Sequence, residues 1–198
     1  MTARWVVDEV APVRDLNVEW EPISLLFKNR PDPGSDRYAG SLRTHRLLRV
    51  MESVRTGYGN EGVFRAYWGF GTRIHHDEQL FDFDVGEVLS GVGLDTAHAA
   101  AFDDASWDTE IRARMDSGLE LVGQDVGTPI IAMDDAEGAR VGIFGPVITK
   151  VPPADESLRL WDIVVEATRT PSFWELKRTR TEPPEFGDRP GRVPAAST

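Results

Sequence analysis

The chain has 198 residues, no cysteine and a formal net charge of −11 at pH 7. The lack of cysteine excludes disulfides, thiolate metal sites and cysteine nucleophiles within these residues, and the acidic balance disfavours binding to nucleic-acid phosphates. No apolar run reaches the roughly eighteen residues of a membrane span, and acidic residues interrupt the apolar N-terminus as they would not in a signal peptide. We therefore expect a cytoplasmic protein without a nucleic-acid or membrane partner.

The first part of the chain is predicted to form a helix, a strand and a loop. Apolar residues at helical spacing indicate a helix over residues 2–11, with no capping residue before it and with Pro12 as its end. The alternating stretch LNVEWEPISL predicts a strand over residues 16–24. The stretch KNRPDPGSDR, with two prolines and a glycine, then predicts a loop.

The middle of the chain has the periodicity of a block of helices. Apolar residues recur every three or four positions over residues 38–58 and 60–76, which predicts two helices. Asp84 and Asp95 are candidate N-caps of two shorter helices. A further helix is predicted over residues 106–122.

The last part combines a hairpin with a helix. Strands are predicted at residues 130–133 and 141–144, on either side of the turn DDAEGA. Helical spacing predicts a helix over residues 158–168, and SFWELKR predicts one more short helical piece. From residue 179 onward the chain is proline-rich and polar, which is typical of a segment without a fixed fold.

This order of elements predicts an α/β fold, because a strand, a helical crossover, a hairpin and a final helix can share one sheet. A proline stands at the mouth of the first hairpin strand, in DVGTPIIAM. Proline cannot donate to a sheet ladder and is normally confined to edges and strand starts. The start of a strand thus tolerates this proline, and the kink that it introduces there suggests a function.

Several stretches resemble the DsbA-like family of thioredoxin-fold oxidoreductases, and within it the actinobacterial mycothiol-dependent nitroreductases. They are RWVVDEVAPVRDLNVEWEPISLLFKN, GTRIH, GLELVGQDVGTPIIAM, FGPVITKVPPADESLRLWD and FWELKRTRTEPPEF. The resemblance covers nearly all of residues 3–186 and implies a thioredoxin-like fold with an inserted helical domain. It divides the chain into a partial thioredoxin-like βα unit, a helical insertion, a hairpin with the C-terminal helix, and the tail: residues 1–36, 37–122, 123–178 and 179–198.

The resemblance also implies a binding site. In that family the bond before the matching proline is cis, and the strand edge beside it pairs with a thiol or peptide, so we expect a cis bond between Thr128 and Pro129. Asn29 and Tyr38 match polar residues that line the thiol and substrate site, and their amide and phenol suit hydrogen bonds to a thiol cofactor or a nitro group. From the residues alone, Asn29 is better explained as a turn residue and Tyr38 as a packing side chain.

The redox motif of the family is missing from this chain. Its Cys-x-x-Cys turn precedes the first helix, where the helix dipole stabilises a thiolate, and MTARWVVDEV matches the part of that helix after the motif. The chain is then either a shortened protein or one whose start lies roughly 20–25 residues upstream. We favour the second, an N-terminal truncation, because loss of a central strand would leave unpaired edges and an open core. We expect such a chain to express poorly and to have no catalytic residue of its own.

The function implied by the resemblance is reduction of small electrophiles, such as nitro compounds, with mycothiol or another low-molecular-weight thiol. The alternatives are a thiol-dependent isomerase similar to 2-hydroxychromene-2-carboxylate isomerase and a non-catalytic thioredoxin-fold binding protein. The stretch from His75 to Glu78 does not suggest a metal site, because adjacent helical residues diverge and the i,i+4 histidine spacing is absent. The oligomeric state is not indicated by the sequence.

Overall fold

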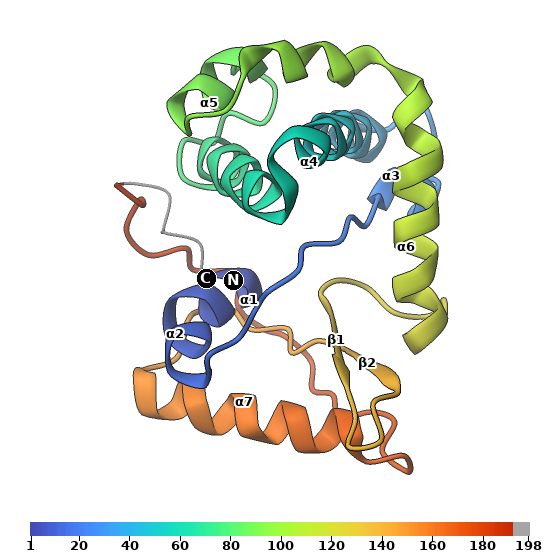
Figure 1. Ribbon diagram of the computed structural model, residues 1–198, viewed down its shortest axis with the longest axis vertical. Helices are drawn as coiled ribbons and strands as arrows, with labels where there is room; N and C mark the ends of the chain where they lie inside the picture. Colours follow the sequence, from blue (N-terminus) through green and yellow to red (C-terminus); the bar gives the residue numbers. More distant parts are fainter. Residues whose placement is uncertain (192–198) are drawn as a thin grey trace. The chain divides into compact units, whose positions relative to one another are not determined.

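A computed structural model describes residues 1–191 of the chain and divides into two compact units (Figure 1). The first, here called the hairpin unit, contains Met1–Val18 and Ser117–Gly187. The second, here called the helical unit, contains Glu19–Asp116 together with residues 188–191. The described chain is thus a mixed, helix-rich α/β protein with one small two-stranded sheet.

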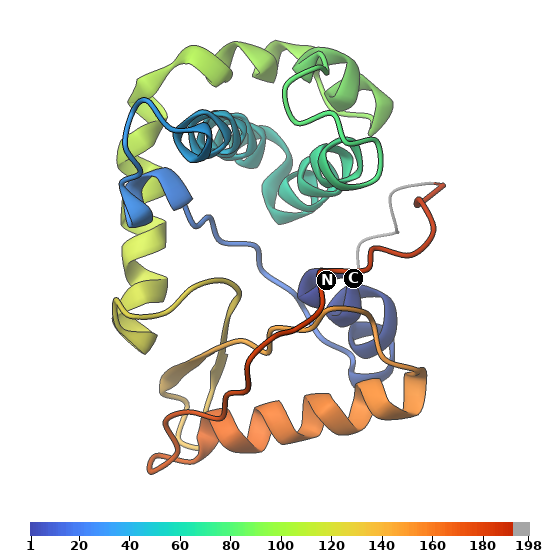
Figure 2. The same ribbon diagram turned by 180° about the vertical axis from the view of Figure 1, so that it is seen from behind.

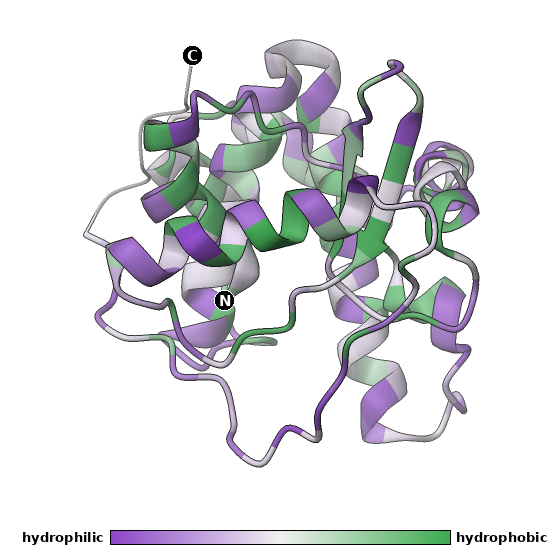
Figure 3. Cartoon of the chain, turned by 90° about the horizontal axis from the view of Figure 1, so that it is seen from below, coloured by the Kyte–Doolittle hydropathy of each residue, from purple (hydrophilic) through white to green (hydrophobic). Residues whose placement is uncertain are grey.

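The hairpin unit joins the two ends of the chain around α7. Its elements are α1 (Thr2–Trp5), a π-helical turn (Val6–Val10), α2 (Ala11–Arg14), β1 (Ile130–Asp134), β2 (Arg140–Phe144) and α7 (Ala154–Arg169). The N-terminal helical segment packs near one end of α7 and the hairpin near the other (Figures 1 and 2). Apolar and polar residues alternate along the helices (Figure 3), as expected for helices with one buried face.

The core of the hairpin unit centres on two tryptophans. Trp5 is fully buried and Trp161 nearly so, and their rings meet edge to face with centroids 6.0 Å apart. Ile131 and Met133 of β1 and Ile143 of β2 pack against this cluster. Because the N-terminal helical segment, α7 and both strands contribute side chains to this core, the core fixes the hairpin to α7.

The predicted hairpin is confirmed, and each strand extends one residue further toward the turn than expected. Strand pairing is antiparallel, with Ile131 opposite Ile143. The Asp135 carboxylate accepts hydrogen bonds from the main-chain N–H groups of Glu137 and Ala139. Gly138 has a φ of 81°, in the left-handed region that glycine enters at little cost.

The helical unit is a cluster of helices around α4. Its elements are α3 (Leu25–Asn29), α4 (Asp36–His75), α5 (Val85–Gly91), two 3₁₀ segments (Thr96–Asp103 and Ala105–Trp107) and the first part of α6 (Asp108–Val122). Its core is formed by apolar side chains of α4 and α5, which include Leu47, Val50, Val54, Val63, Phe70 and Leu89.

The boundaries predicted for the helices agree well with those of the helices in this unit. Gly59 has non-helical backbone angles inside α4, so this helix comprises the two that are predicted on either side of that glycine. Asp84 and Asp95 are N-caps, as predicted, and each side chain accepts a bond from a main-chain N–H of its first turn. The helix predicted over residues 106–122 is α6, preceded by a 3₁₀ turn.

The strand predicted over residues 16–24 is wrong, since this described segment contains no strand residue. A strand needs a ladder of main-chain bonds to a neighbour, whereas the main chain of Trp20 bonds to side chains of α4. Its N–H donates to Asn60 Oδ1 (2.9 Å), and its carbonyl accepts from Arg55 Nη2 (2.6 Å). The Trp20 ring stacks on Phe64 and Tyr67, so burial of that side chain accounts for part of the apolar pattern.

Two helix predictions also need correction. Pro12 does not end the first helical segment, because it occupies the first turn of α2, where its missing N–H is not required. The segment SFWELKR, residues 172–178, is not helical. Trp174 and Leu176 are 88% and 87% exposed, so a helix there would gain no stability from apolar burial.

The tail is in part outside the described residues. Residues 192–198 lie beyond them, and residues 179–191 contain no helix or strand. Glu185 N–H donates to the Thr149 carbonyl (2.6 Å) within the hairpin unit. Within the helical unit, Arg189 makes two bonds to the Asp77 carboxylate (2.6 and 2.9 Å), and together with a bond from Arg73 this pairing lowers the pKa of Asp77 to about 2.

The tryptophan pair predicts a large effect of one substitution. Trp5→Ala should lower the free energy of unfolding by about 3–5 kcal/mol, since it leaves a cavity against Trp161. Trp174→Ala removes the same side chain from an exposed site and should change stability by less than about 0.5 kcal/mol. Urea unfolding of the two variants measures both values, and similar midpoints would contradict this account of the core.

Candidate functional site

Thr128 and Pro129 lie at the open end of the hairpin, where Thr128 is exposed and Pro129 half-buried. The bond between them is cis, and a second cis bond, between Gly145 and Pro146, follows β2. Gly145 N–H donates to the Pro129 carbonyl (2.8 Å). Thr2 Oγ1 donates to the Pro146 carbonyl (2.7 Å), which brings the start of α1 to the same end of the hairpin.

The hydrogen bonds of the hairpin determine which main-chain groups of β1 face outward. In an antiparallel pair, hydrogen-bonded and non-hydrogen-bonded residue pairs alternate. The bond from Gly145 to Pro129 places the odd-numbered residues of β1 toward β2. The N–H and C=O groups of Ile130 and Ala132 therefore point away from β2.

This outward edge is open over most of its length. At its far end the Asp134 carbonyl accepts two bonds from the Arg169 guanidinium of α7 (3.0 and 3.2 Å). Within residues 1–191, no hydrogen bond reaches the outward main chain of Thr128, Ile130 or Ala132. A strand edge with unpaired groups can take up another extended segment.

Asn29 and Tyr38 belong to the helical unit. Asn29 is the exposed last residue of α3, and Arg30 after it adopts the left-handed C-cap conformation. Tyr38 is half-buried in the first turn of α4, where its N–H donates to the side chain of the N-cap Ser35 (3.2 Å). Neither the Asn29 amide nor the Tyr38 hydroxyl bonds to another described residue, so both are available to a ligand.

A buried polar chain beside α3 is not apparent from the sequence. Ser24, the N-cap of α3, lies with its Oγ 2.9 Å from His45 Nδ1. His45 Nε2 lies 3.0 Å from Asp108 Oδ1, and Arg49 holds the same carboxylate with bonds of 2.6 and 2.8 Å. Ser24 and His45 are 0% and 1% exposed. The sequence gives a local signal only for the cap at Ser24, because the residues that bond to one another here are far apart in the sequence.

Serine, histidine and aspartate bonded in this order also form the triad of hydrolases, but here the three residues have a structural role. Ser24 Oγ accepts the N–H of Phe27, as a cap does (3.2 Å). A nucleophile must be reachable by substrate, and a fully buried side chain is not. The burial of His45 lowers its pKa, although Asp108 opposes that shift. Burial would raise the pKa of Asp108, but the bonds from Arg49 and His45 outweigh it and leave this pKa lowered.

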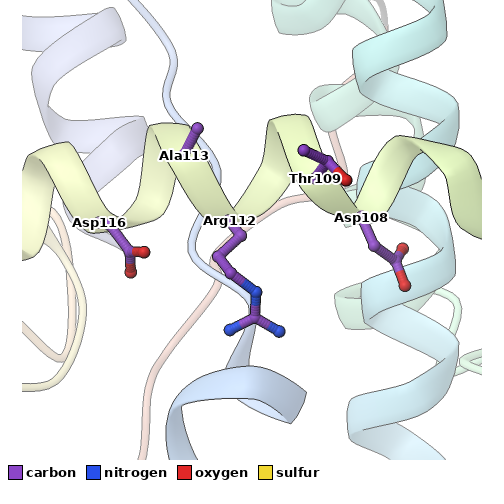
Figure 4. Close-up of a pocket in the computed structure, with 5 residues that line it drawn as sticks. All are labelled: Asp108, Thr109, Arg112, Ala113 and Asp116. Carbon is purple, nitrogen blue, oxygen red and sulfur yellow. The ribbon is translucent and has the colours of Figure 1, made fainter.

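Two open cavities lie along α6 in the helical unit. The smaller, of about 320 Å³, is lined by Asp108, Thr109, Arg112, Ala113 and Asp116 (Figure 4). Figure 4 shows the Arg112 side chain reaching toward α3, where its guanidinium lies 4.1 Å from the centre of the Phe27 ring.

The larger cavity, of about 590 Å³, contains the buried Glu52, which is paired with Arg55 and Arg114. Its charged side chains thus bind one another. Neither cavity includes a site residue that the sequence predicts.

The described residues show no grouping of three metal-ligating side chains of the kind that binds a metal ion. In the same part of the chain, every helix is too short or too polar to cross a membrane.

A comparison with protein-family models identifies the family. The model described as Rv2466c-like, mycothiol-dependent nitroreductase Rv2466c, matches residues 1–178. The chain belongs to this family. The match confirms the subgroup that the sequence resembles and indicates thiol-dependent reduction, with a low-molecular-weight thiol and a nitro compound as reaction partners.

The burial of His45 predicts a pH-dependent stability. Because the folded-state pKa of His45 is below its ordinary value of 6.5, the unfolded chain binds more protons as the pH falls through about 6.5. The free energy of unfolding should therefore fall with pH in this window, by at most about 1.4 kcal/mol per pH unit. His45→Asn should flatten this slope.

Urea unfolding of wild type and His45→Asn between about pH 7.5 and pH 5.5 measures the difference in slope. The charged groups that face His45 are Asp108, Arg49 and Arg112, and all are retained in the variant. His98→Asn is a matched control on the same unit and should keep the part of the pH slope that His45 contributes in wild type. Parallel slopes for wild type and His45→Asn would contradict the prediction.

Proposed function

We propose that the protein is a thioredoxin-like, DsbA-related reductase that acts in the cytoplasm, binds mycothiol at the strand edge beside Pro129 and serves the reduction of small nitro compounds. The observation that carries this proposal is the open outward edge of β1 beside Pro129, at Ile130 and Ala132, in a chain of a mycothiol-dependent family. The family match supports the thiol and the class of substrate, and the edge supports the place of binding.

The residues at this edge fit a cysteine-derived thiol. Such a thiol carries an amide next to its sulfur, and an amide can pair with a strand edge as an added strand does. Ile130 and Ala132 offer outward N–H and C=O groups, whereas the Pro129 carbonyl is occupied by Gly145.

The chemistry requires two electrons for the first reduction step. When bound, mycothiol supplies the reducing power, since two thiols give two electrons and two protons, become one disulfide, and convert a nitro group into a nitroso group and water. The 198 residues contain no cysteine. Within these residues, the role of the chain is therefore to bind and orient the thiol and the substrate.

Asn29 and Tyr38 are proposed to contact the thiol or the substrate. The Asn29 amide can donate to a nitro or carbonyl oxygen, and the Tyr38 hydroxyl can donate to an oxygen or accept from an amide. Their side chains have no bond to other described residues, so ligand binding would not have to break one. A cysteine-free chain also favours a second candidate, a binding protein that holds a thiol compound without converting it.

Calorimetric titration with mycothiol tests these roles. Asn29→Ala and Tyr38→Phe should each weaken binding by about five- to tenfold, the loss of one hydrogen bond. Asn17→Ala, which removes an exposed amide from the hairpin unit, is the matched control and should bind as wild type does. Unchanged affinity in both site variants would refute their proposed roles, and no binding by wild type would refute the thiol site.

A further inference from the structure

α3 is a short helix that cannot hold its own position. None of its five residues is buried, and Leu25 is 40% exposed. An isolated helix of this length is unstable in water, because too few hydrogen bonds repay the cost of nucleation. Contacts outside α3 must therefore fix it, and with it Asn29 at its C-terminal end.

The anchor points of α3 are Ser24 and Phe27, and both contact His45. Ser24 is fully buried, accepts the Phe27 N–H and lies 2.9 Å from His45 Nδ1. The Phe27 ring packs against the imidazole, with 4.4 Å between ring centres. Arg112 covers Phe27 at 4.1 Å from the ring centre.

One tautomer of His45 satisfies every bond of this chain. With the proton on Nε2, His45 donates to Asp108 and keeps Nδ1 as an acceptor for the Ser24 hydroxyl. Ser24 Oγ can then still accept from the Phe27 N–H. Asp108 is itself held by two bonds from Arg49. The chain of bonds thus runs from α6 through α4 to the N-cap of α3.

We propose that His45 is a positioning residue for the thiol and substrate site, because it fixes the N-cap of α3 and thereby the place of Asn29. The role of Asn29 rests on the proposed function. The anchoring of α3 by His45 does not require any role for Asn29 in binding, so the two parts can be tested separately.

Two substitutions of His45 separate its two hydrogen bonds. An asparagine amide reaches the position of Nδ1 and can keep the bond to Ser24, whereas a glutamine amide reaches toward Nε2 and can keep the bond to Asp108. Both variants lose the ring against Phe27, so faster exchange in the glutamine variant reports the bond to Ser24, and faster exchange in the asparagine variant reports the bond to Asp108. The readout is hydrogen exchange of the α3 amides of Lys28 and Arg30, which donate to the carbonyls of Ser24 and Leu26.

Exchange at these amides should be about tenfold faster in His45→Gln than in His45→Asn, the effect of one hydrogen bond. Ser53→Ala is the matched control, because it removes an equivalent bond on α4, from Ser53 Oγ to His98 Nδ1 (2.8 Å), and should leave α3 unchanged. Equal exchange rates in wild type, His45→Gln and His45→Asn would overturn the anchoring.

The link to binding is tested by calorimetry with mycothiol. His45→Gln and Asn29→Ala should each weaken binding, and the double variant should bind no more weakly than Asn29→Ala alone, since both act through the same side chain. Fully additive losses would overturn the positioning role. Unchanged affinity in Asn29→Ala would refute the proposed role of Asn29 and with it the positioning role, while the exchange rates would still decide the anchoring of α3.

Discussion

The outward edge of β1 imposes the main constraint on this protein, because main-chain N–H and C=O groups need partners. β2 satisfies one side of β1, and Arg169 satisfies the last carbonyl on the other side. The outward groups of Ile130 and Ala132 are left for a partner beyond the described residues. The core around Trp5 and Trp161 holds this edge in place, since β1 packs against it through Ile131 and Met133.

The helical unit is subject to a different constraint, because a short helix such as α3 must be held in place by polar contacts with its neighbours. α3 has no buried side chain and depends on the Ser24 cap, His45 and Phe27 for its position. The buried charges of this unit are paired: Arg49 with Asp108, and Glu52 with Arg55. Buried pairs of this kind contribute to a defined arrangement only when all partners are present, so the loss of one partner costs more than the pair provides.

Features with local signals were predictable from the sequence. The hairpin follows from its turn and its two apolar runs, and the caps at Asp84 and Asp95 precede their helices directly. The extended, unpaired conformation of residues 16–24 was not predictable. Strand formation depends on a distant partner, and at Trp20 side chains of α4 bond the main chain in place of a neighbouring strand. Pro12 was misread because the same residue can end one helix or begin the next.

The candidate site divides in the same way. Pro129 stands out in the sequence because it introduces a kink directly before an apolar strand, whereas Asn29 and Tyr38 are indicated only by family resemblance. The bonds of Ser24 and Asp108 to His45 span 21 and 63 residues and leave no pattern that a single sequence could show.

The most direct test of this account is nuclear magnetic resonance of the amides of β1 during titration with mycothiol. The edge at Pro129 predicts that the amide signals of Thr128, Ile130 and Ala132 shift and that the outward amides gain protection from exchange. The amides of Ile131 and Met133, which face β2, should change much less. If mycothiol binds but leaves the amide signals of Thr128, Ile130 and Ala132 unchanged, the proposed site is contradicted.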